Sequence, residues 1–269
     1  MLLNLLVGTV AAGAIALVAY RAAALTASGA IATVTLGAVV FGLGGLGASV
    51  PLITFFVLSS ALSRIGRGER RSRAEEAFEK GGRRDAGQVL ANGGVAGALV
   101  LYAYLASENA VMSPMIFAAV VGSLAAAAAD TWGTEIGILG RGPVISLGTL
   151  RRVEPGRSGG ISAHGTIGAI TGAAIVSASA IAWSSTPIIT LVAATVGGVA
   201  GMLADGLAGA TIQARRCCPS CGRLTERDEH CGRPTLVAGG LAFVGNVAVN
   251  VFCCLVGALV AGALAGALG

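Results

Sequence analysis

Long apolar runs constrain this chain more than any other feature of its sequence. A helix needs about 20 mostly apolar residues to cross the hydrocarbon core of a bilayer, and several runs of this kind occur along the 269 residues. The chain is 55% hydrophobic and 12% charged, with a mean hydropathy of +0.82, which leaves too few polar side chains to cover a water-exposed surface. We therefore predict an all-α fold, a polytopic bundle of transmembrane helices in a single membrane domain, 1–269.

Eight apolar segments are the candidate spans, within a range of six to nine. The third is short for a crossing, and the last is long enough to tilt, kink or break. The first could be mistaken for a signal peptide, but no basic residue precedes it and Arg21 follows it. The segments cover about residues 1–20, 29–46, 48–63, 86–106, 114–139, 162–184, 187–212 and 236–267.

Basic residues are confined to one side of this arrangement. Apart from Arg21, all of the 18 Lys and Arg residues lie in three polar loops, 64–85, 140–161 and 213–235. Short loops that retain Lys and Arg face the cytoplasm, so eight spans and an outside N-terminus place all three loops there, at the plasma membrane of a prokaryote. This topology and the attraction to anionic membrane lipids explain the net charge of +5, and we expect no nucleic-acid partner.

The first of these loops and the glycine content carry two further predictions. In 64–85, Arg and Glu alternate at helical spacing, which predicts a solvated surface helix. With 42 Gly and only 4% aromatic residues, the helices must pack through small side chains, and the run 165–172 puts such residues on one helical stripe. Cys253 and Cys254 lie in the last segment and are expected to pack there.

Three carboxylates lie inside the predicted spans, in their cytoplasmic thirds. An ionisable group in a span costs at least a few kcal/mol unless it meets a partner or a wet cavity, so Asp130, Glu135 and Asp205 are the candidate catalytic residues. Asp130 and Thr131 share one face of the fifth segment, whereas Glu135 is rotated by about 140° from Asp130. Glu135 is therefore expected to bind something different, unless the helix breaks at Gly133.

Asparagines lie at a similar depth in the other segments. Asn246 and Asn250 are one helical turn apart on the eighth segment, and Asn92 lies on the fourth. Mg²⁺ is held by one or two carboxylates together with substrate phosphates and water, so we predict that Asp130 and Asp205 bind Mg²⁺ in a polar chamber open to the cytoplasm. The alternative is that these polar groups only join one helix to another.

A segment with three Arg and three Gly follows the fifth span, at 151–160. Guanidinium groups bind phosphate oxygens bidentately, and glycine lets backbone N–H groups approach an anion. A carboxylate pair beside such a loop is typical of phosphoryl transfer, although the arginines are also explained as a topology signal. The candidates for binding substrate and phosphate are Arg83, Arg84, Asn92, Thr131, Arg151, Arg152, Glu154, Arg157, Ser158, Asn246 and Asn250.

Cysteines cluster in the third polar loop. Cys-Pro-Ser-Cys-Gly is typical of a zinc knuckle, because thiolates separated by two residues can take two corners of a tetrahedron. The predicted ligands are Cys218, Cys221, His230 and Cys231. Cys217 is an alternative to either His230 or Cys231. Because the loop is expected to face a reducing cytoplasm, reduced thiols without a metal are the main alternative to a structural Zn²⁺, and a redox function ranks after these two.

Several ordered motifs together suggest a known family. They are Ala-Asp-Thr-Trp-Gly-Thr-Glu-Ile-Gly at 129–137, the Arg-Gly segment extended to 151–162, Gly-Arg-Arg-Asp-Ala-Gly-Gln-Val-Leu-Ala-Asn-Gly-Gly at 82–94, and the terminal Asn-x-x-x-Asn. Over nearly the whole chain they resemble the transmembrane protein 19 family, which includes the plant phytyl-phosphate kinase, and more distantly the phytol and dolichol kinases. The chain departs from the commoner motif at Arg157, where Thr-Asn is familiar.

The resemblance implies transfer of a phosphoryl group from a nucleoside triphosphate, with CTP as a candidate, to an isoprenoid monophosphate such as phytyl or geranylgeranyl phosphate. We expect the lipid to enter between Gly-lined helices and its head group to meet the nucleotide at the cytoplasmic surface. One alternative is an ion-coupled transporter or lipid flippase, which needs a polar path to both faces. Another is a lipid-phosphate cytidylyltransferase, which releases pyrophosphate.

Overall fold

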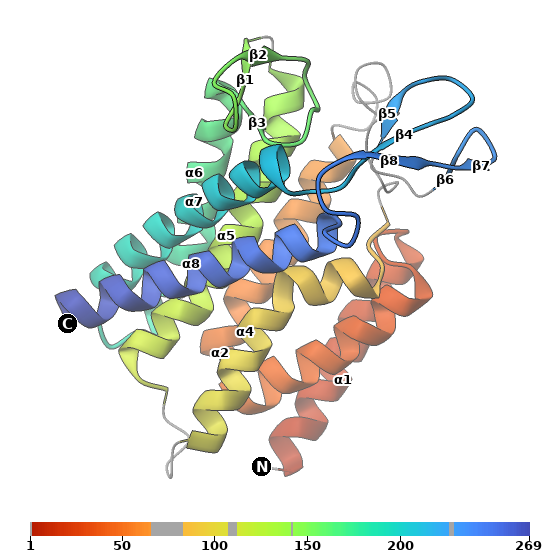
Figure 1. Cartoon of the computed structure of the whole chain (residues 1–269). Coiled ribbons are helices and arrows are strands. Elements are labelled where there is room, and N and C mark those ends of the chain that lie inside the picture. The colour runs from red at the N-terminus through yellow and green to blue at the C-terminus, as the bar shows by residue number, and fades with distance from the viewer. Residues whose placement is uncertain (1, 66–82, 107–111, 141, 226–228) are drawn as a thin grey trace.

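The protein is a bundle of long apolar helices that carries small β-sheets at one end (Figure 1). The computed structural model describes residues 2–65, 83–106, 112–140, 142–225 and 229–269. Seven helical stretches in these residues are long and apolar enough to cross a membrane, with α6 extended through the short helix η1 (Ile181–Trp183). The helices are α1 (Leu2–Arg21), α2 (Ala27–Ile65), α4 (Ala86–Ala106), α5 (Pro114–Leu139), α6 (Ala163–Ala178), α7 (Pro187–Thr211) and α8 (Asn246–Leu268).

Helix α2 consists of two halves that run along the bundle in opposite directions. Its 39 residues would extend about 58 Å as one straight helix, roughly twice the hydrocarbon thickness. The helix breaks at Gly45, where φ is 61° and ψ is −158°. Before the break Gly42 packs against Leu5, near the start of α1, and after it Arg64 Nη2 donates a hydrogen bond to the carbonyl of Ala22, just beyond the end of α1. The eight predicted segments therefore correspond to α1, the two halves of α2, and α4 to α8.

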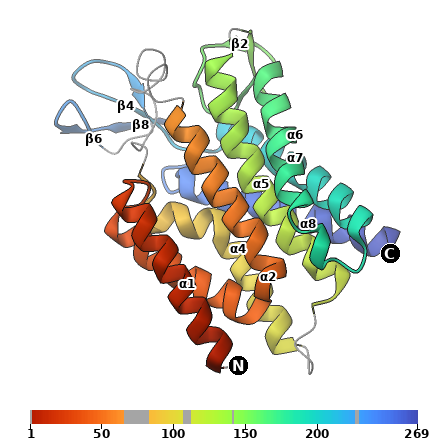
Figure 2. The same cartoon turned by 180° about the vertical axis from the view of Figure 1, so that it is seen from behind.

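Helix α5 occupies the centre of the bundle. It contacts α2, α4, α6, α7 and α8, and Figure 2 shows it between α2 and α6. Every residue of 117–129 is buried, and these residues are mostly Ala and Val. This stretch forms the main apolar core, and the core ends one residue before Asp130.

Small residues bring the central helices into close contact, as the glycine content predicts. A Cβ added at Gly201 of α7 would lie 2.6 Å from Ala126 Cβ on α5 and 2.6 Å from the carbonyl of Cys253 on α8. Gly165, Gly168 and Gly172 of α6 likewise face α5. Cys253 and its neighbour Cys254 are buried, which confirms their predicted packing role.

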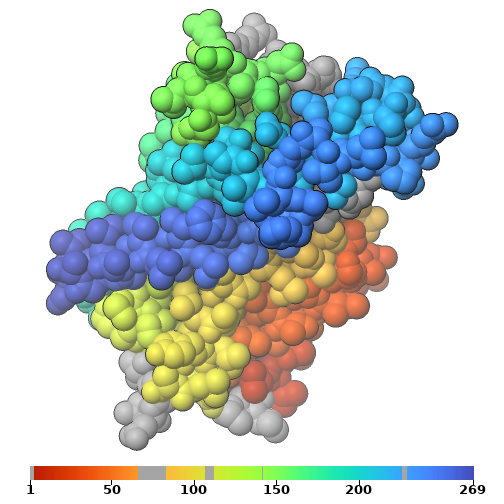
Figure 3. Space-filling model, in the orientation of Figure 1, coloured from red at the N-terminus to blue at the C-terminus, as the bar shows by residue number. Residues whose placement is uncertain are grey.

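The loops contain short strands that the all-α prediction did not include. The first sheet has the strand order β2-β1-β3 and lies in the loop 140–161, called here the Arg-Gly loop. The other strands form a three-stranded sheet, β5-β4-β8, and a hairpin, β6-β7. All lie at one end of the helices, called here the strand-bearing end, where they project as two lobes in Figure 3. The strands are β1 (Val144–Ser146), β2 (Arg152–Val153), β3 (Gly160–Ile161), β4 (Arg215–Cys217), β5 (Leu224–Thr225), β6 (Glu229–His230), β7 (Arg233–Pro234) and β8 (Leu236–Gly239).

The last predicted span is shorter than expected. Residues 236–239 form β8 and pair antiparallel with β4, so α8 begins only at Asn246. A turn at Gly240, with φ of 73°, separates the strand from the helix. The predicted surface helix of 64–85 falls mostly on residues 66–82, which lie outside the described residues.

Candidate functional site

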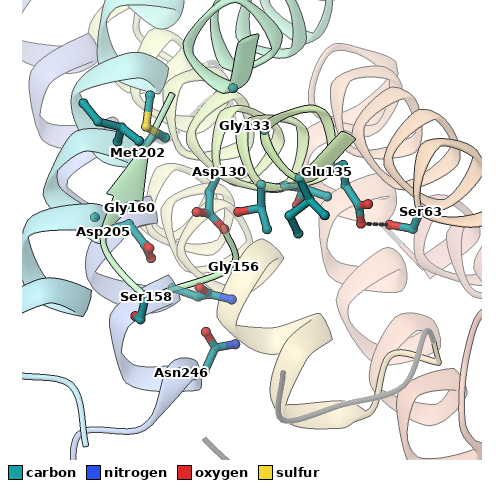
Figure 4. A pocket seen from close by; sticks show the side chains of 18 of the residues that line it. Ser63, Asp130, Gly133, Glu135, Gly156, Ser158, Gly160, Met202, Asp205 and Asn246 are labelled. Atoms are coloured by element: carbon teal, nitrogen blue, oxygen red, sulfur yellow. Dashed lines mark hydrogen bonds between the residues drawn. The ribbon is translucent and has the colours of Figure 1, made fainter. Parts of the chain in front are cut away.

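A polar cavity of about 300 Å³ opens at the strand-bearing end, directly above the apolar core (Figure 4). Residues from α2, α4, α5, α6, α7, α8 and the Arg-Gly loop all contribute to its wall. Most of the sequence-predicted site residues thus meet in one place although they come from distant parts of the chain. The ionisable and amide residues of the wall are Arg64, Arg84, Gln88, Asn92, Asp130, Glu135, Arg157, Asp205, Gln213, Asn246 and Asn250.

Asp130 of α5 and Asp205 of α7 form the centre of the cavity wall. Both side chains point into the same space in Figure 4, and their carboxyl groups lie within hydrogen-bonding reach of each other. Both residues are half-buried. Two carboxylates held this close repel each other unless a proton or a cation lies between them, so the pair is suited to binding a hard divalent ion.

Glu135 lies on the same helix but points elsewhere. The Ser63 hydroxyl of α2 donates a hydrogen bond of 2.6 Å to Glu135 Oε1, and Figure 4 shows this side chain turned away from Asp130. One turn earlier, Trp132 Nε1 donates a hydrogen bond of 3.2 Å to the Ser59 hydroxyl, so a second hydrogen bond joins α5 to α2 beside that of Glu135. Since α5 is helical through Leu139 without a break at Gly133, the separation of the two acids follows from the helical rotation.

The asparagines line the side of the cavity formed by α4 and α8. Asn246 and Asn250 lie on the first turns of α8, and Asn92 lies on α4. The Cys254 thiol contacts the Asn92 carbonyl with 3.7 Å between sulfur and oxygen, so α8 and α4 pack closely at this depth. Thr131 also lines the cavity, but its hydroxyl donates to the Ala127 carbonyl of its own helix.

Only the second half of the Arg-Gly loop reaches the cavity. Arg157 and Ser158 line it, and the Ser158 hydroxyl donates a 2.8 Å hydrogen bond to Gln213 Oε1, just beyond α7. Gly159, with φ of 76°, lies so close to α7 that an added Cβ would be 2.5 Å from the Gly206 carbonyl. The loop can therefore rest on α7 only with glycine at this position. Of the predicted phosphate ligands, Arg151, Arg152 and Glu154 are exposed around β2 and do not line the cavity.

Arg83 and Arg84 have different surroundings. Arg83 donates from Nε and Nη2 to the Leu25 carbonyl and lies over the Tyr20 ring at 5.6 Å, so it anchors the end of α1 and does not line the cavity. Arg84 lines the cavity, and its guanidinium lies 5.3 Å from the centre of the Phe55 ring. Burial lowers the pKa of Arg84 to about 10, which leaves it charged at neutral pH.

The predicted metal ligands come together in the loop between α7 and α8. Two tight turns present them, one between β4 and β5 and one between β6 and β7. The Cys217 thiol turns instead to the Gly222 carbonyl, so Cys217 is not part of the group. The four ligand atoms, one each from Cys218, Cys221, His230 and Cys231, all lie within 4.8 Å of one another.

The spacing of these atoms fits a tetrahedral metal ion. His230 Nδ1 lies 3.5 Å from the Cys221 sulfur and 3.2 Å from the Cys231 sulfur. Zinc with its usual bond lengths separates sulfur and nitrogen ligands by about 3.6 Å. Burial raises the pKa of the Cys218 thiol, but hydrogen bonds with His230 and with the backbone of Cys221 and Ser220 outweigh it and lower the pKa to about 6. The thiolate that a metal requires is thus available at neutral pH, and the group can hold a metal such as zinc.

Some residues of the cavity were not predicted from the sequence. Ser63 and Gln213 are uncharged, and nothing in their local sequence indicates that they contact Glu135 and Ser158. A partial signal existed for Ser63, since Ser59 and Ser63 lie one turn apart on an otherwise apolar segment. Gln213 lies in no span and no motif, so only its position after α7 brings it to the loop.

Comparison with known proteins agrees with this architecture. Protein PGR of Arabidopsis thaliana is 28% identical over 232 residues, which cover 78% of this chain and 79% of that protein. An uncharacterized membrane protein of Methanocaldococcus jannaschii is 27% identical over 254 residues, which cover 94% of this chain and 97% of that protein. No solved structure matches the chain. The family model of the integral membrane protein DUF92 matches residues 10–258, and the chain therefore belongs to this family of integral membrane proteins.

Proposed function

We propose that this chain is a membrane-embedded kinase that transfers a phosphoryl group from a nucleoside triphosphate, with CTP as the first candidate, to an isoprenoid monophosphate. The meeting of Asp130 and Asp205 in a cavity that also holds Arg84 and Arg157 is the observation that carries the proposal. Phosphoryl transfer depends mainly on positioning and on neutralising charge, and this wall offers both acidic and basic groups for it. The resemblance to the transmembrane protein 19 family adds the substrate class.

Mg²⁺ is the metal that these residues fit. Two carboxylates within hydrogen-bonding reach, beside the Asn246 and Asn250 amides, offer the hard oxygen ligands that Mg²⁺ takes together with phosphates and water. When bound, Mg²⁺ would neutralise phosphate charge and orient the transferred group. Asp130 and Asp205 are its proposed ligands, and Asn92, Asn246 and Asn250 position the metal or the substrates around it.

The two arginines of the cavity suggest two phosphate positions. Arg157 and Ser158 come from the Arg-Gly loop over α7, whereas Arg84 lies just before the start of α4. We assign the loop residues to the nucleotide and Arg84 to the lipid phosphate. Their guanidinium groups can each bind phosphate oxygens bidentately.

The proposed reaction needs little acid–base catalysis by the protein. An oxygen of the lipid phosphate forms a bond to the γ-phosphorus, the bond from that phosphorus to the β–γ bridging oxygen breaks, and the nucleoside diphosphate leaves with the bonding electrons. A phosphate monoester, with a second pKa of about 6, is already largely deprotonated at neutral pH. A general base is therefore unnecessary, in agreement with a cavity wall whose described residues include no histidine.

The location of the charges supports a cytoplasmic cavity. All described Arg residues lie at the strand-bearing end or in the loops attached to it. Because retained basic residues face the cytoplasm, we assign this end to the cytoplasmic side, with the N-terminus outside. Cellular nucleotides then have direct access to the polar cavity.

The closed core argues against a transporter or flippase. From 117 to 129 the central helix is buried, with Ser123 as the one polar side chain of this stretch, and it packs against Val176 of α6 and Cys254 of α8. The polar cavity thus ends at this layer within the described residues. A transport path would have to open through it, whereas a kinase needs only the end that carries the charges.

A structural Zn²⁺ at the cysteine group completes the proposal. Cys218, Cys221, His230 and Cys231 supply four ligands, as in closed structural sites, and leave no position for a substrate. We assign the ion to holding the β4–β8 segment together, because strands of two to four residues cannot form a stable domain by themselves.

The kinase proposal is tested with the purified protein in detergent or nanodiscs. Geranylgeranyl or phytyl phosphate, Mg²⁺ and each nucleoside triphosphate should yield the lipid diphosphate and a nucleoside diphosphate. Asp130→Asn and Asp205→Asn should each lower turnover at least about a hundredfold, because the loss of one carboxylate weakens metal binding where charge develops. Leu207→Ala, an exposed change on the same helix as Asp205 and outside the cavity wall, should alter turnover much less.

The products separate the proposal from its rivals. Release of pyrophosphate with a cytidylylated lipid would make the chain a cytidylyltransferase. Full turnover by Asp130→Asn would remove this residue from metal binding. A well-folded protein that binds no nucleotide, judged by the absence of a Mg²⁺-dependent thermal shift with CTP, ATP, GTP or UTP, would contradict any kinase activity.

A further inference from the structure

A second cavity, apolar throughout most of its wall, adjoins the polar one. It lies between α1, both halves of α2 and α4, and has a volume of about 90 Å³. Its wall contains Leu36, Leu52 and the aromatic rings of Phe41, Phe55 and Phe56. No carboxylate belongs to this wall among the described residues.

The two cavities meet at Arg84, Gln88 and Asn92, which line both. All three belong to the start of α4 or to the residues just before it. One side of this short row thus faces the carboxylate pair, and the other faces the apolar cavity. A molecule that spans the junction would place a polar group near Asp130 and an apolar group among the rings of α2.

Arg84 is held firmly at this junction. Its backbone N–H donates to the Ala24 carbonyl, and its own carbonyl accepts from the Thr26 N–H, which ties the residue to the chain between α1 and α2. The guanidinium stacks over Phe55 and Phe56, at 5.3 and 5.8 Å from the ring centres. Among the described residues no carboxylate pairs with it, so its charge is available to an anion.

We propose that the apolar cavity holds the first isoprene units of the lipid substrate, with its phosphate bound by Arg84 at the junction. This proposal rests on the proposed kinase function and assigns a place to the substrate chain. Charge complementarity selects the occupant, because a cation lies at one end of an otherwise apolar wall. A nucleotide, with its polar base and ribose, does not suit such a wall, whereas a prenyl phosphate has the matching order of anion and hydrocarbon.

The volume and the position of the cavity limit how much of the chain it holds. A space of about 90 Å³ accommodates only the units next to the phosphate. The remaining units would extend past α1, which packs chiefly on α2 at the outside of the bundle (Figure 2). Recognition is therefore expected to depend on the phosphate and the adjoining units more than on total chain length.

The test fills the cavity from two different helices and compares each change with a matched control. Ala11→Trp and Thr33→Phe add bulk to the cavity wall, while Ala14→Trp and Thr35→Phe add the same bulk at exposed positions of the same helices. Thr33 and Thr35 are a close match, since each hydroxyl donates to the carbonyl four residues earlier. Equilibrium binding of radiolabelled geranylgeranyl phosphate in nanodiscs is measured without nucleotide.

Both filling variants should weaken binding about tenfold or more, the loss that follows when two or more CH₂ groups are expelled from an apolar site. Both control variants should bind as the unmodified protein does. Arg84→Gln should weaken binding of geranylgeranyl phosphate but not of geranylgeraniol, because only the phosphate needs the cation. Thermal unfolding of each variant shows whether it is folded.

The outcomes separate this site from the kinase proposal. Unchanged lipid binding by both folded filling variants overturns the chain site, even if the protein is an active kinase. Displacement of the prenyl phosphate by an equal amount of phosphatidic acid overturns the isoprenoid assignment, as does the absence of any lipid binding by the unmodified protein. Binding that follows the predicted pattern without turnover supports the site and contradicts the kinase.

Discussion

Arg83 and Arg84 are adjacent in the chain, yet only Arg84 reaches the cavity. Arg83 is occupied by the Leu25 carbonyl and the Tyr20 ring, whereas Arg84 lies among aromatic rings beside the polar space. The same division separates Arg157 from Arg151 and Arg152 in the Arg-Gly loop. Arginine in a motif therefore makes a residue a candidate for phosphate binding, while the neighbours of its side chain decide whether it reaches the cavity.

The cysteines of the β4–β8 segment allow a test at single residues. Cys221→Ser should remove the bound zinc from the purified protein, because it takes away one of four ligands, and the zinc content by elemental analysis should fall from about one ion per chain to near zero. Cys217→Ser is the matched control, since Cys217 ends β4 next to the same turn but lies outside the group of four ligands, and the zinc content of this variant should stay unchanged. Zinc near zero in the unmodified protein, with no effect of a chelator, would show that the thiols are free.

At the scale of the elements, glycine decides how closely the spans approach and where one of them reverses. Gly45 interrupts α2 and the chain reverses there, so one continuous apolar run supplies two helical stretches of the bundle. Gly201 brings α7 against α5 and α8, close to the level at which Asp205 of α7 faces Asp130 of α5. The close approach of these helices is therefore a condition for the meeting of the carboxylates.

Substitution of a central glycine should weaken the bundle. Gly201→Leu places a side chain where an added Cβ would lie 2.6 Å from neighbouring atoms, so the helices must separate. The expected cost is about 1–3 kcal/mol or more, seen as a lower thermal unfolding midpoint in detergent. Gly13→Leu on α1, where an added Cβ meets nothing within 4 Å, should leave the midpoint nearly unchanged. Equal midpoints for the two variants would contradict close packing at Gly201.

At the scale of the whole molecule, the chain is strongly one-sided. The strands, the polar cavity and the four candidate metal ligands all lie at the strand-bearing end, while the other half of the central helix is buried and mostly apolar. We therefore expect any polar ligand to bind from one side only. The lipid face of the helices would then be available to the hydrocarbon part of the proposed substrate.

The orientation of the molecule is tested by labelling introduced cysteines in intact cells. Ser185→Cys lies in the turn between α6 and α7, opposite the strand-bearing end, and Thr149→Cys lies between β1 and β2. With the strand-bearing end in the cytoplasm, a membrane-impermeant maleimide should label Ser185→Cys and leave Thr149→Cys unlabelled until the cells are opened. The reverse pattern would place the cavity outside and remove the supply of cellular nucleotide.

Features that depend on local chemistry could be predicted from the amino-acid sequence. Apolar length set the spans, because a bilayer core requires about 20 apolar residues, and α4, α5 and α7 begin and end within a residue of the predicted bounds. The helical period also predicted that Glu135 points away from Asp130, as the structure shows. The spacing of the cysteines and His230 likewise identified all four residues of the metal-ligand group.

The contacts between groups far apart in the chain could not be predicted and became visible only in the folded molecule. The sequence did not indicate that Ser63 would bind Glu135, that Gln213 would hold Ser158, or that 236–239 would leave the last span to pair with β4. It also did not show that Arg84 joins a polar cavity to an apolar one. Such contacts join residues far apart in the chain, and the close packing of many helices at once determines them, whereas helix period and apolar length act within one segment.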